Sequence, residues 1–161
     1  MRNVKVSIVS FSYKRGLPED NTGNGGGFVF DCRAMPNTFW DEALRGYSGC
    51  DEPVVEFFEQ HKDKVNPFLE AAERLVRLSI DQYLADGREH LQVAFGCTGN
   101  ARAAKRSGCL SAMREPRRGR KGPRQHRSVY FAERFAALLR GLDGVEVELF
   151  HAAKACWRNF A

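Results

Sequence analysis

Four short apolar segments alternate with helical segments along this chain, and this order limits the folds available to it. The apolar segments have the length and composition of strands and are Val4–Phe11, Phe28–Cys32, Leu91–Phe95 and Val145–Phe150. Strands that alternate with helices favour a mostly parallel sheet with helices packed on its faces. We therefore expect one α/β domain over residues 1–161.

The clearest helical segment runs from about Pro67 to Ala85. Asn66 is a suitable N-cap, Pro67 fits the first helical position, and Gly87 ends the pattern. Apolar residues recur there at spacings of three and four, and they are Leu69, Ala72, Leu75, Val76, Ile80, Tyr83 and Leu84. Further helices are predicted around 40–46 and 53–61 and from about Ser128 to Arg140.

The net charge of +5 is unevenly distributed. Residues 100–127 hold ten basic residues and one acid, a net charge of +9, whereas the other 133 residues carry −4. Such a basic run can neutralise phosphates and make nucleic-acid binding depend steeply on salt. The alternative is a solvated loop without a dedicated partner, since no aromatic residues interleave with the basic ones for base stacking. We treat residues 100–124 as a basic insertion.

The five cysteines are not arranged as disulfide or zinc-binding motifs. Their number is odd, no CxxC pair occurs, and no histidine falls at zinc-site spacing. This usage favours reduced thiols and a cytoplasmic protein. No apolar run has the length of a membrane-spanning helix, and Met1–Lys5 does not resemble a signal peptide. We expect no membrane partner.

The strongest local signal is a glycine-rich turn after a strand, followed later by the start of a helix. The turn is Gly96-Cys97-Thr98-Gly99, and the helix opens at Gln125-His126-Arg127-Ser128. If the basic insertion loops out, both pieces meet at the carboxyl end of a strand, where backbone N–H groups favour an anion. Arg127 and His126 would add charge-assisted hydrogen bonds, and Thr98 and Ser128 would add hydroxyls. The alternative is an ordinary strand–loop–helix junction capped by Ser128.

Other polar residues follow the predicted strands. Asp31 and Arg33 follow the second strand, so they could share the anion site, because open α/β sheets bind ligands at the carboxyl ends of strands. A local Asp31–Arg33 salt bridge is the alternative. Gly23–Phe28 does not fit a dinucleotide fingerprint, and no GxxxxGK[ST] motif is present.

Cys97 suggests a Cys-dependent phosphatase as a minor alternative. A thiolate in a phosphate-binding loop can form a phosphocysteine, and a helix N-terminus lowers a thiol pKa. However, such loops need their Cys and Arg close together, and 29 residues lie between Cys97 and Arg127. A small buried cysteine fits better, so we expect no catalytic residue, metal or cofactor.

Four ordered motifs resemble the RapZ C-terminal domain family. They are Ser10–Pro18, Phe30–Asn37, Gly96–Gly99 and His126–Tyr130, and the similarity runs from about Val4 to His151. The family's full-length members are RNase adapters whose C-terminal domain binds small regulatory RNA and senses glucosamine-6-phosphate. The resemblance is to that domain alone, without the N-terminal P-loop nucleotide-binding module.

The resemblance implies a non-catalytic domain that binds a phosphorylated small molecule, with a regulatory or accessory role in amino-sugar metabolism. The resemblance implies an amino-sugar phosphate such as glucosamine-6-phosphate as the ligand and a sugar kinase-type protein as a partner. Matching the motifs residue by residue places the ligand at Thr98, Gly99, His126, Arg127 and Ser128, with Asp31 and Arg33 nearby.

RNA binding is the alternative function that the resemblance implies. The RNA-facing residues would be Lys14 and Arg45, together with Arg117, Arg118, Arg120 and Lys121 of the basic insertion. This chain departs from the family in two ways. About 24 extra residues separate the two halves of the anion-binding motif, and Arg15 and Phe39 stand where some RNA-binding members carry His.

Overall fold

Four parallel strands form one sheet in the order β2-β3-β1-β4. The computed structural model describes residues 3–20, 22–47, 49–98 and 126–151. The strands are β1 (Val4–Ser12), β2 (Phe28–Asp31), β3 (His90–Cys97) and β4 (Val145–His151). Each neighbouring pair is parallel, and β1 lies between β3 and β4. The predicted α/β fold is confirmed, with strands at all four expected places.

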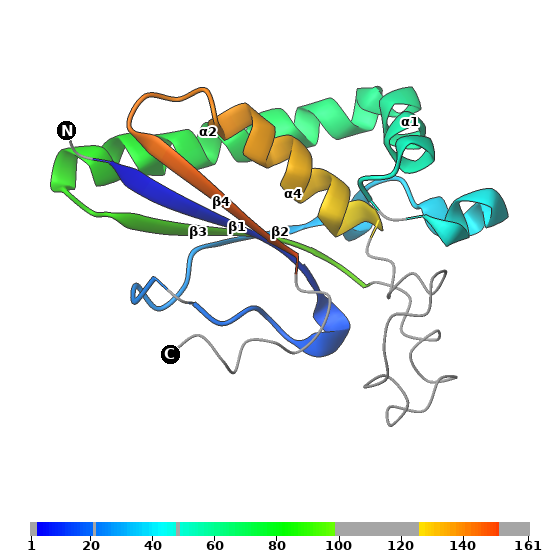
Figure 1. Ribbon diagram of the computed structural model, residues 1–161, viewed down its shortest axis with the longest axis horizontal. Coiled ribbons are helices and arrows are strands. Elements are labelled where there is room, and N and C mark those ends of the chain that lie inside the picture. The colour runs from blue at the N-terminus through cyan, green and yellow to red at the C-terminus, as the bar shows by residue number, and fades with distance from the viewer. Residues whose placement is uncertain (1–2, 21, 48, 99–125, 152–161) are drawn as a thin grey trace.

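The described helices are α1 (Glu52–Gln60), α2 (Lys62–Asp86) and α4 (His126–Leu139). Figure 1 shows α2 and α4 on the same side of the sheet. Four short 3₁₀ helices lie after β1 and β2: η1 (Tyr13–Arg15), η2 (Cys32–Ala34), η3 (Thr38–Trp40) and η4 (Glu42–Gly46). The helix expected at 40–46 is therefore 3₁₀ rather than α-helical, whereas the helix expected at 53–61 is confirmed as α1.

The predicted start of α2 at Pro67 is wrong, because the helix begins five residues earlier. The amide of Val65 donates to the carbonyl of His61 at 3.1 Å, so a helical turn closes before the proline is reached. Val65 is buried and opens the apolar stripe that the sequence pattern began at Leu69. Pro67 cannot donate to the carbonyl of Asp63, and the packing of this stripe outweighs that missing bond.

The end of α2 is as predicted, but fewer of its apolar residues are buried than the sequence pattern predicts. Gly87 takes a left-handed conformation with φ of 73°, and its N–H donates to the carbonyl of Tyr83. Leu75, which the pattern placed on the inward face, is 51% exposed. The buried residues of α2 are Val65, Leu69, Ala72, Val76 and Ile80.

The main core lies between the sheet and the helices. Val4, Val6 and Ile8 point from β1 into a cluster that α4 covers with five fully buried side chains, Phe131, Ala132, Phe135, Ala136 and Leu139. Aromatic rings join the layers, with ring centroids of Phe95 and Phe135 5.1 Å apart. Burial of this apolar area is the main stabilising term for such a domain.

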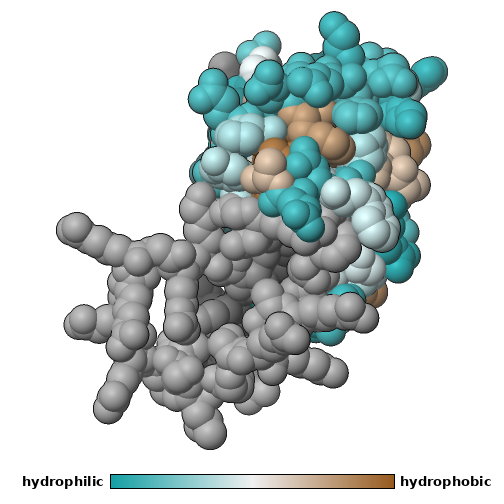
Figure 2. Space-filling view, turned by 90° about the vertical axis from the view of Figure 1, so that its right-hand side faces the viewer, coloured by the Kyte–Doolittle hydropathy of each residue, from teal (hydrophilic) through white to brown (hydrophobic). Residues whose placement is uncertain are grey.

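In the side view of Figure 2, the surface of the described residues is mostly hydrophilic, with hydrophobic residues near its middle and along its right-hand edge. Among the residues that the structure describes, no helix is both long and apolar enough to cross a membrane.

Gly27 allows β2 to approach β3 closely. A Cβ placed on Gly27 would overlap the backbone carbonyl of Gln92, which precedes the β3 residue paired with Phe28. Because the overlapping atoms belong to the backbone of β3, the clash cannot be relieved by rotation of a side chain.

We predict that Gly27→Ala lowers the free energy of unfolding by roughly 1–3 kcal/mol, because the extra methyl forces the β2 backbone away from β3. Urea denaturation followed by circular dichroism measures this change. Gly141→Ala is the matched control, because a Cβ there meets nothing within 4 Å. Equal stability of the two variants would contradict the close approach of the strands.

Candidate ligand-binding site

The carboxyl ends of β1, β2 and β3 meet at one edge of the sheet. In the strand register, Ser12 lies opposite Cys97, and Asp31 lies opposite Gly96. The hydroxyl of Ser12 donates to the carbonyl of Thr98 at 3.2 Å, which fixes the chain just after β3. Residues that follow three different strands are therefore neighbours at this edge.

The first turn of α4 lies at the same edge. The Cys97 thiol donates to the Ser128 hydroxyl at 3.3 Å, across 31 positions of sequence, and both side chains are buried. The two halves of the predicted anion-binding motif are thus brought together around this contact. N–H groups in the first turn of a helix have no intrahelical acceptor, so this turn favours a negatively charged group.

Asp31 and Arg33 form a bidentate ion pair just after β2. The Arg33 Nε lies 2.9 Å from each carboxylate oxygen, and its Nη2 lies 2.6 Å from Oδ2. The Arg33 amide also donates to Asp31 Oδ1 at 2.8 Å. These hydrogen bonds lower the pKa of Asp31, and the charges of Arg33 and Arg127 lower it further. The salt bridge offered as the alternative for these residues is therefore present, and Arg127 lies near enough to act on its carboxylate.

Arg127 links α4 to the segment that follows β2. Its Nη1 donates to the carbonyl of Arg33 at 2.8 Å and to the carbonyl of Met35 at 3.2 Å. A guanidinium has five N–H donors, and these two bonds use one nitrogen. Arg127 therefore positions Arg33 while keeping its positive charge at the same edge.

Tyr13 belongs to this group although the sequence did not single it out as a site residue. The Arg33 guanidinium lies 4.2 Å from the centre of the Tyr13 ring, as in a cation–π contact. Burial, followed by the charge of Asp31, raises the pKa of the Tyr13 hydroxyl. A tyrosine in a polar turn gives no sequence signal for this role, because its partner lies 20 residues away on another strand end.

The other predicted site residues lie in η1, in η4, at the start of α4 and outside the described ranges. Lys14 follows Tyr13 in η1 at this edge, and Arg45 belongs to η4. His126 is the first residue of α4. For Arg45 and His126 the structure describes the backbone alone. Five predicted residues lie outside the described ranges: Gly99, Arg117, Arg118, Arg120 and Lys121.

The two cysteines at this edge are deeply buried. Cys97 is 2% exposed and Cys32 is 0% exposed. Burial raises the pKa of the Cys32 thiol well above its usual value, and the nearby Cys97 adds to this effect. A buried thiol that donates to Ser128 fits a packing role better than attack on a ligand.

Comparison with known proteins identifies the family. The model of the RapZ C-terminal domain matches residues 4–110. A nucleotide-binding protein of Methylobacillus flagellatus is 36% identical over 81% of this chain, and one of Thermobifida fusca is 32% identical over 92%. The matched regions make up 36% and 40% of those two relatives, so the chain spans well under half of their length. The chain belongs to the RapZ C-terminal domain family.

Proposed function

We propose that this edge of the sheet binds a phosphorylated small molecule, and that the domain is regulatory and non-catalytic. The observation that carries the proposal is the contact of Ser128, in the first turn of α4, with Cys97 at the end of β3, next to Arg127, which bonds to the segment after β2. A helix N-terminus beside a guanidinium is a recurrent environment for phosphate.

Arg33 and Arg127 provide the positive charge for this proposal. The Arg127 guanidinium donates to the backbone carbonyl of Arg33, so the two residues are in direct contact. The Thr98 hydroxyl would add a neutral hydrogen bond to the phosphate, and Ser128, whose buried hydroxyl contacts Cys97, would contribute its backbone N–H in the first turn of α4. Gly99 and His126 complete the proposed set by their places in the sequence.

Among sugar phosphates, the Asp31 carboxylate favours an amino sugar, whose ammonium group it can bind. Its carboxylate lies beside the two arginines, and its lowered pKa keeps it negatively charged at neutral pH. Arg33 already places three N–H donors on this carboxylate, from its amide, Nε and Nη2, so about one of its four lone-pair sites is left for a ligand ammonium. Glucosamine-6-phosphate carries an ammonium and a phosphate, and it is the ligand we propose.

RNA binding is a second candidate. The relatives that match this chain are named nucleotide-binding proteins. Lys14 and Arg33 follow β1 and β2 at the candidate edge, and the ten basic residues of 100–127 are close to this site in sequence. The proposed RNA contacts are Lys14, Arg45, Arg117, Arg118, Arg120 and Lys121. The family and the names of the relatives support the broader function, a regulatory domain of a nucleotide-binding or RNA-adapter type.

Two further expectations stay predictions, one from the cysteine usage and one from the family resemblance. They are a cytoplasmic location and a kinase-type partner of sugar metabolism.

We predict that glucosamine-6-phosphate raises the melting temperature of the intact protein and that Arg127→Ala removes this rise. At a ligand concentration of about 100 Kd the stabilisation is about 2.7 kcal/mol, which differential scanning fluorimetry detects readily. Arg127→Ala also loses two bonds to backbone carbonyls, so the ligand-induced shift is compared rather than the melting temperature itself. Thr98→Val, which keeps the side-chain shape, reduces the shift, and Asp31→Asn reduces it more for glucosamine-6-phosphate than for glucose-6-phosphate.

Arg74→Ala is the matched control, because Arg74 is exposed on α2. It should retain the full shift. Absence of a shift with every sugar phosphate tried would refute the proposed ligand class. Turnover of an aryl phosphate that Cys97→Ser abolishes would instead reveal the phosphatase and contradict a non-catalytic domain.

We predict for the RNA-binding alternative that affinity falls steeply between about 50 and 200 mM salt, because each neutralised phosphate releases counterions. Fluorescence anisotropy with a labelled RNA hairpin measures the slope. Deletion of residues 100–124 should remove most of the salt dependence. Lys14→Ala should lower the slope of log affinity against log salt concentration by about 1, the change expected for one lost phosphate contact. Lys64→Ala on α2 is the control. A slope that is unchanged by the deletion would argue against the basic insertion as an RNA contact.

A further inference from the structure

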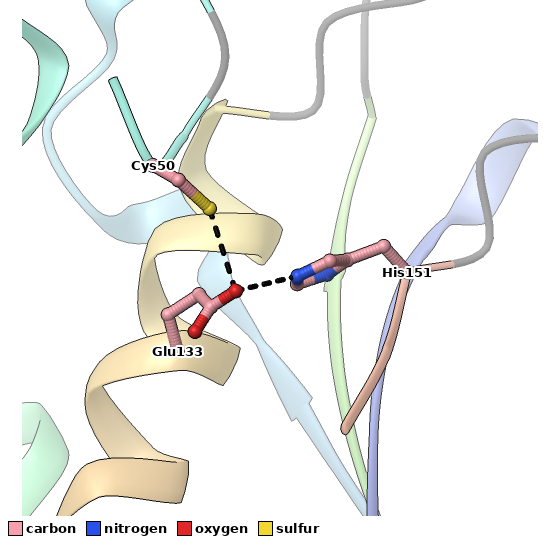
Figure 3. Close-up of side chains that lie close together, drawn as sticks. All are labelled: Cys50, Glu133 and His151. Atoms are coloured by element: carbon pink, nitrogen blue, oxygen red, sulfur yellow. Dashed lines mark hydrogen bonds and ion pairs between the residues drawn. The ribbon is translucent and has the colours of Figure 1, made fainter.

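A second polar cluster lies at the carboxyl end of β4, on the other side of β1 from β3. Figure 3 shows Cys50, Glu133 and His151 pointing toward one another. The Cys50 thiol lies 3.4 Å from Glu133 Oε1, and His151 Nε2 lies 2.8 Å from the same oxygen. Each residue comes from a different part of the fold: the turn before α1, the second turn of α4, and the last position of β4.

The three side chains supply a sulfur, an oxygen and a nitrogen within a small volume. Their ligand atoms all lie within 4.8 Å of one another. Zinc bonds of about 2.3 Å to sulfur and about 2.0–2.2 Å to nitrogen and oxygen put neighbouring ligand atoms of a tetrahedral site roughly 3–4 Å apart. The cluster is therefore already near the size of a zinc site.

Ser10 orients the histidine of this cluster. Its hydroxyl is 2.8 Å from His151 Nδ1, and Ser10 is completely buried. The two residues are partners in the parallel register of β1 and β4, so the sheet itself fixes the contact. A hydrogen bond at one ring nitrogen, which directs the other nitrogen toward the metal, is typical of histidine ligands.

We propose that Cys50, Glu133 and His151 bind one Zn²⁺ ion, with water at the fourth position. A mixed thiolate, imidazole and carboxylate set suits Zn²⁺ better than Mg²⁺ or Ca²⁺, which prefer oxygen ligands throughout. The cluster is partly exposed, so both the ion and the water have access.

Binding changes the protonation of the thiol. Burial and the neighbouring Glu133 carboxylate raise the pKa of Cys50 to about 11, so the thiol holds its proton at neutral pH. When the S–Zn bond forms, that proton passes to solvent, and the two contacts to Glu133 Oε1 are replaced by bonds to the ion.

The proposed ion would tie three distant segments together. Cys50 and Glu133 are 83 residues apart, and Glu133 and His151 are 18 residues apart. The site would join the turn before α1 to α4 and β4, and it shares no residue with the proposed phosphate site. This separation explains why the spacing of Cys and His in the sequence did not predict a zinc site.

The test is a Zn²⁺ titration of the full chain, freed of metal with a chelator and measured in competition with a chromophoric chelator. We predict one Zn²⁺ bound per chain at the site. Cys50→Ser and His151→Gln should each weaken binding at least tenfold, and Ser10→Ala should weaken it by about 10–100-fold, as loss of an outer partner does. Co²⁺ in place of Zn²⁺ should give a thiolate-to-metal charge-transfer absorption in the intact protein that Cys50→Ser lacks.

The double variant Cys109→Ser, Cys156→Ser is the matched control, and it should keep both the stoichiometry and the cobalt band. Absence of Zn²⁺ binding to the intact chain would overturn the proposal, as would a cobalt band unaffected by Cys50→Ser. Glu133→Gln, which keeps the side-chain shape, guards against loss of binding through misfolding. Circular dichroism should show it folded, and unchanged zinc affinity in this variant would also overturn the site.

Discussion

The packing of α4 across β1, β3 and β4 is the interaction on which both candidate sites depend. Five fully buried residues of α4, from Phe131 to Leu139, fix the rotation of the helix about its axis. With that rotation fixed, the first turn points Ser128 at Cys97 of β3, and the next turn points Glu133 at His151 of β4. The hydrophobic core therefore determines which polar groups meet at the carboxyl edge of the sheet.

Arg127 completes the candidate ligand site because it holds a second segment against α4. Its bonds to the carbonyls of Arg33 and Met35 join the helix to η2, and Asp31 holds the Arg33 side chain. The lowered pKa of Asp31 means that this ion pair stabilises the fold at neutral pH. The stabilisation by this ion pair is lost in acid, as the pH falls from the usual pKa of an aspartate through the lowered pKa of Asp31. That contribution is small because both Asp31 and Arg33 are exposed to solvent, which screens their charges.

The strands were predictable because each is a local pattern of apolar residues. The start of α2 was not, since a proline preceded by asparagine looks like a helix start, and only packing of Val65 in the core shows that the helix begins at Lys62. Likewise, two motifs suggested the residues of the candidate anion site, but they gave no sign that Arg127 bonds to the carbonyls of Arg33 and Met35, which lie 94 and 92 residues away in the sequence.

The contact of Tyr13 with Arg33 and the cluster around Glu133 were beyond prediction for a related reason. Neither has a local pattern: Tyr13 and Arg33 meet from the segments after β1 and β2, and the other cluster joins the turn before α1, α4 and the end of β4. Sequence spacing identifies sites built from one segment, whereas the first of these joins two segments and the second joins three.

The central claim is that a sugar phosphate binds at the first turn of α4, and amide NMR of the isotope-labelled protein tests it most directly. Titration with glucosamine-6-phosphate should shift the amide signals of Thr98, Arg127 and Ser128, together with that of Arg33. Signals at the far ends of the strands, such as those of Val4 and Leu91, should stay in place. Saturable shifts confined to other parts of the molecule, or no shifts at millimolar ligand, would contradict the account.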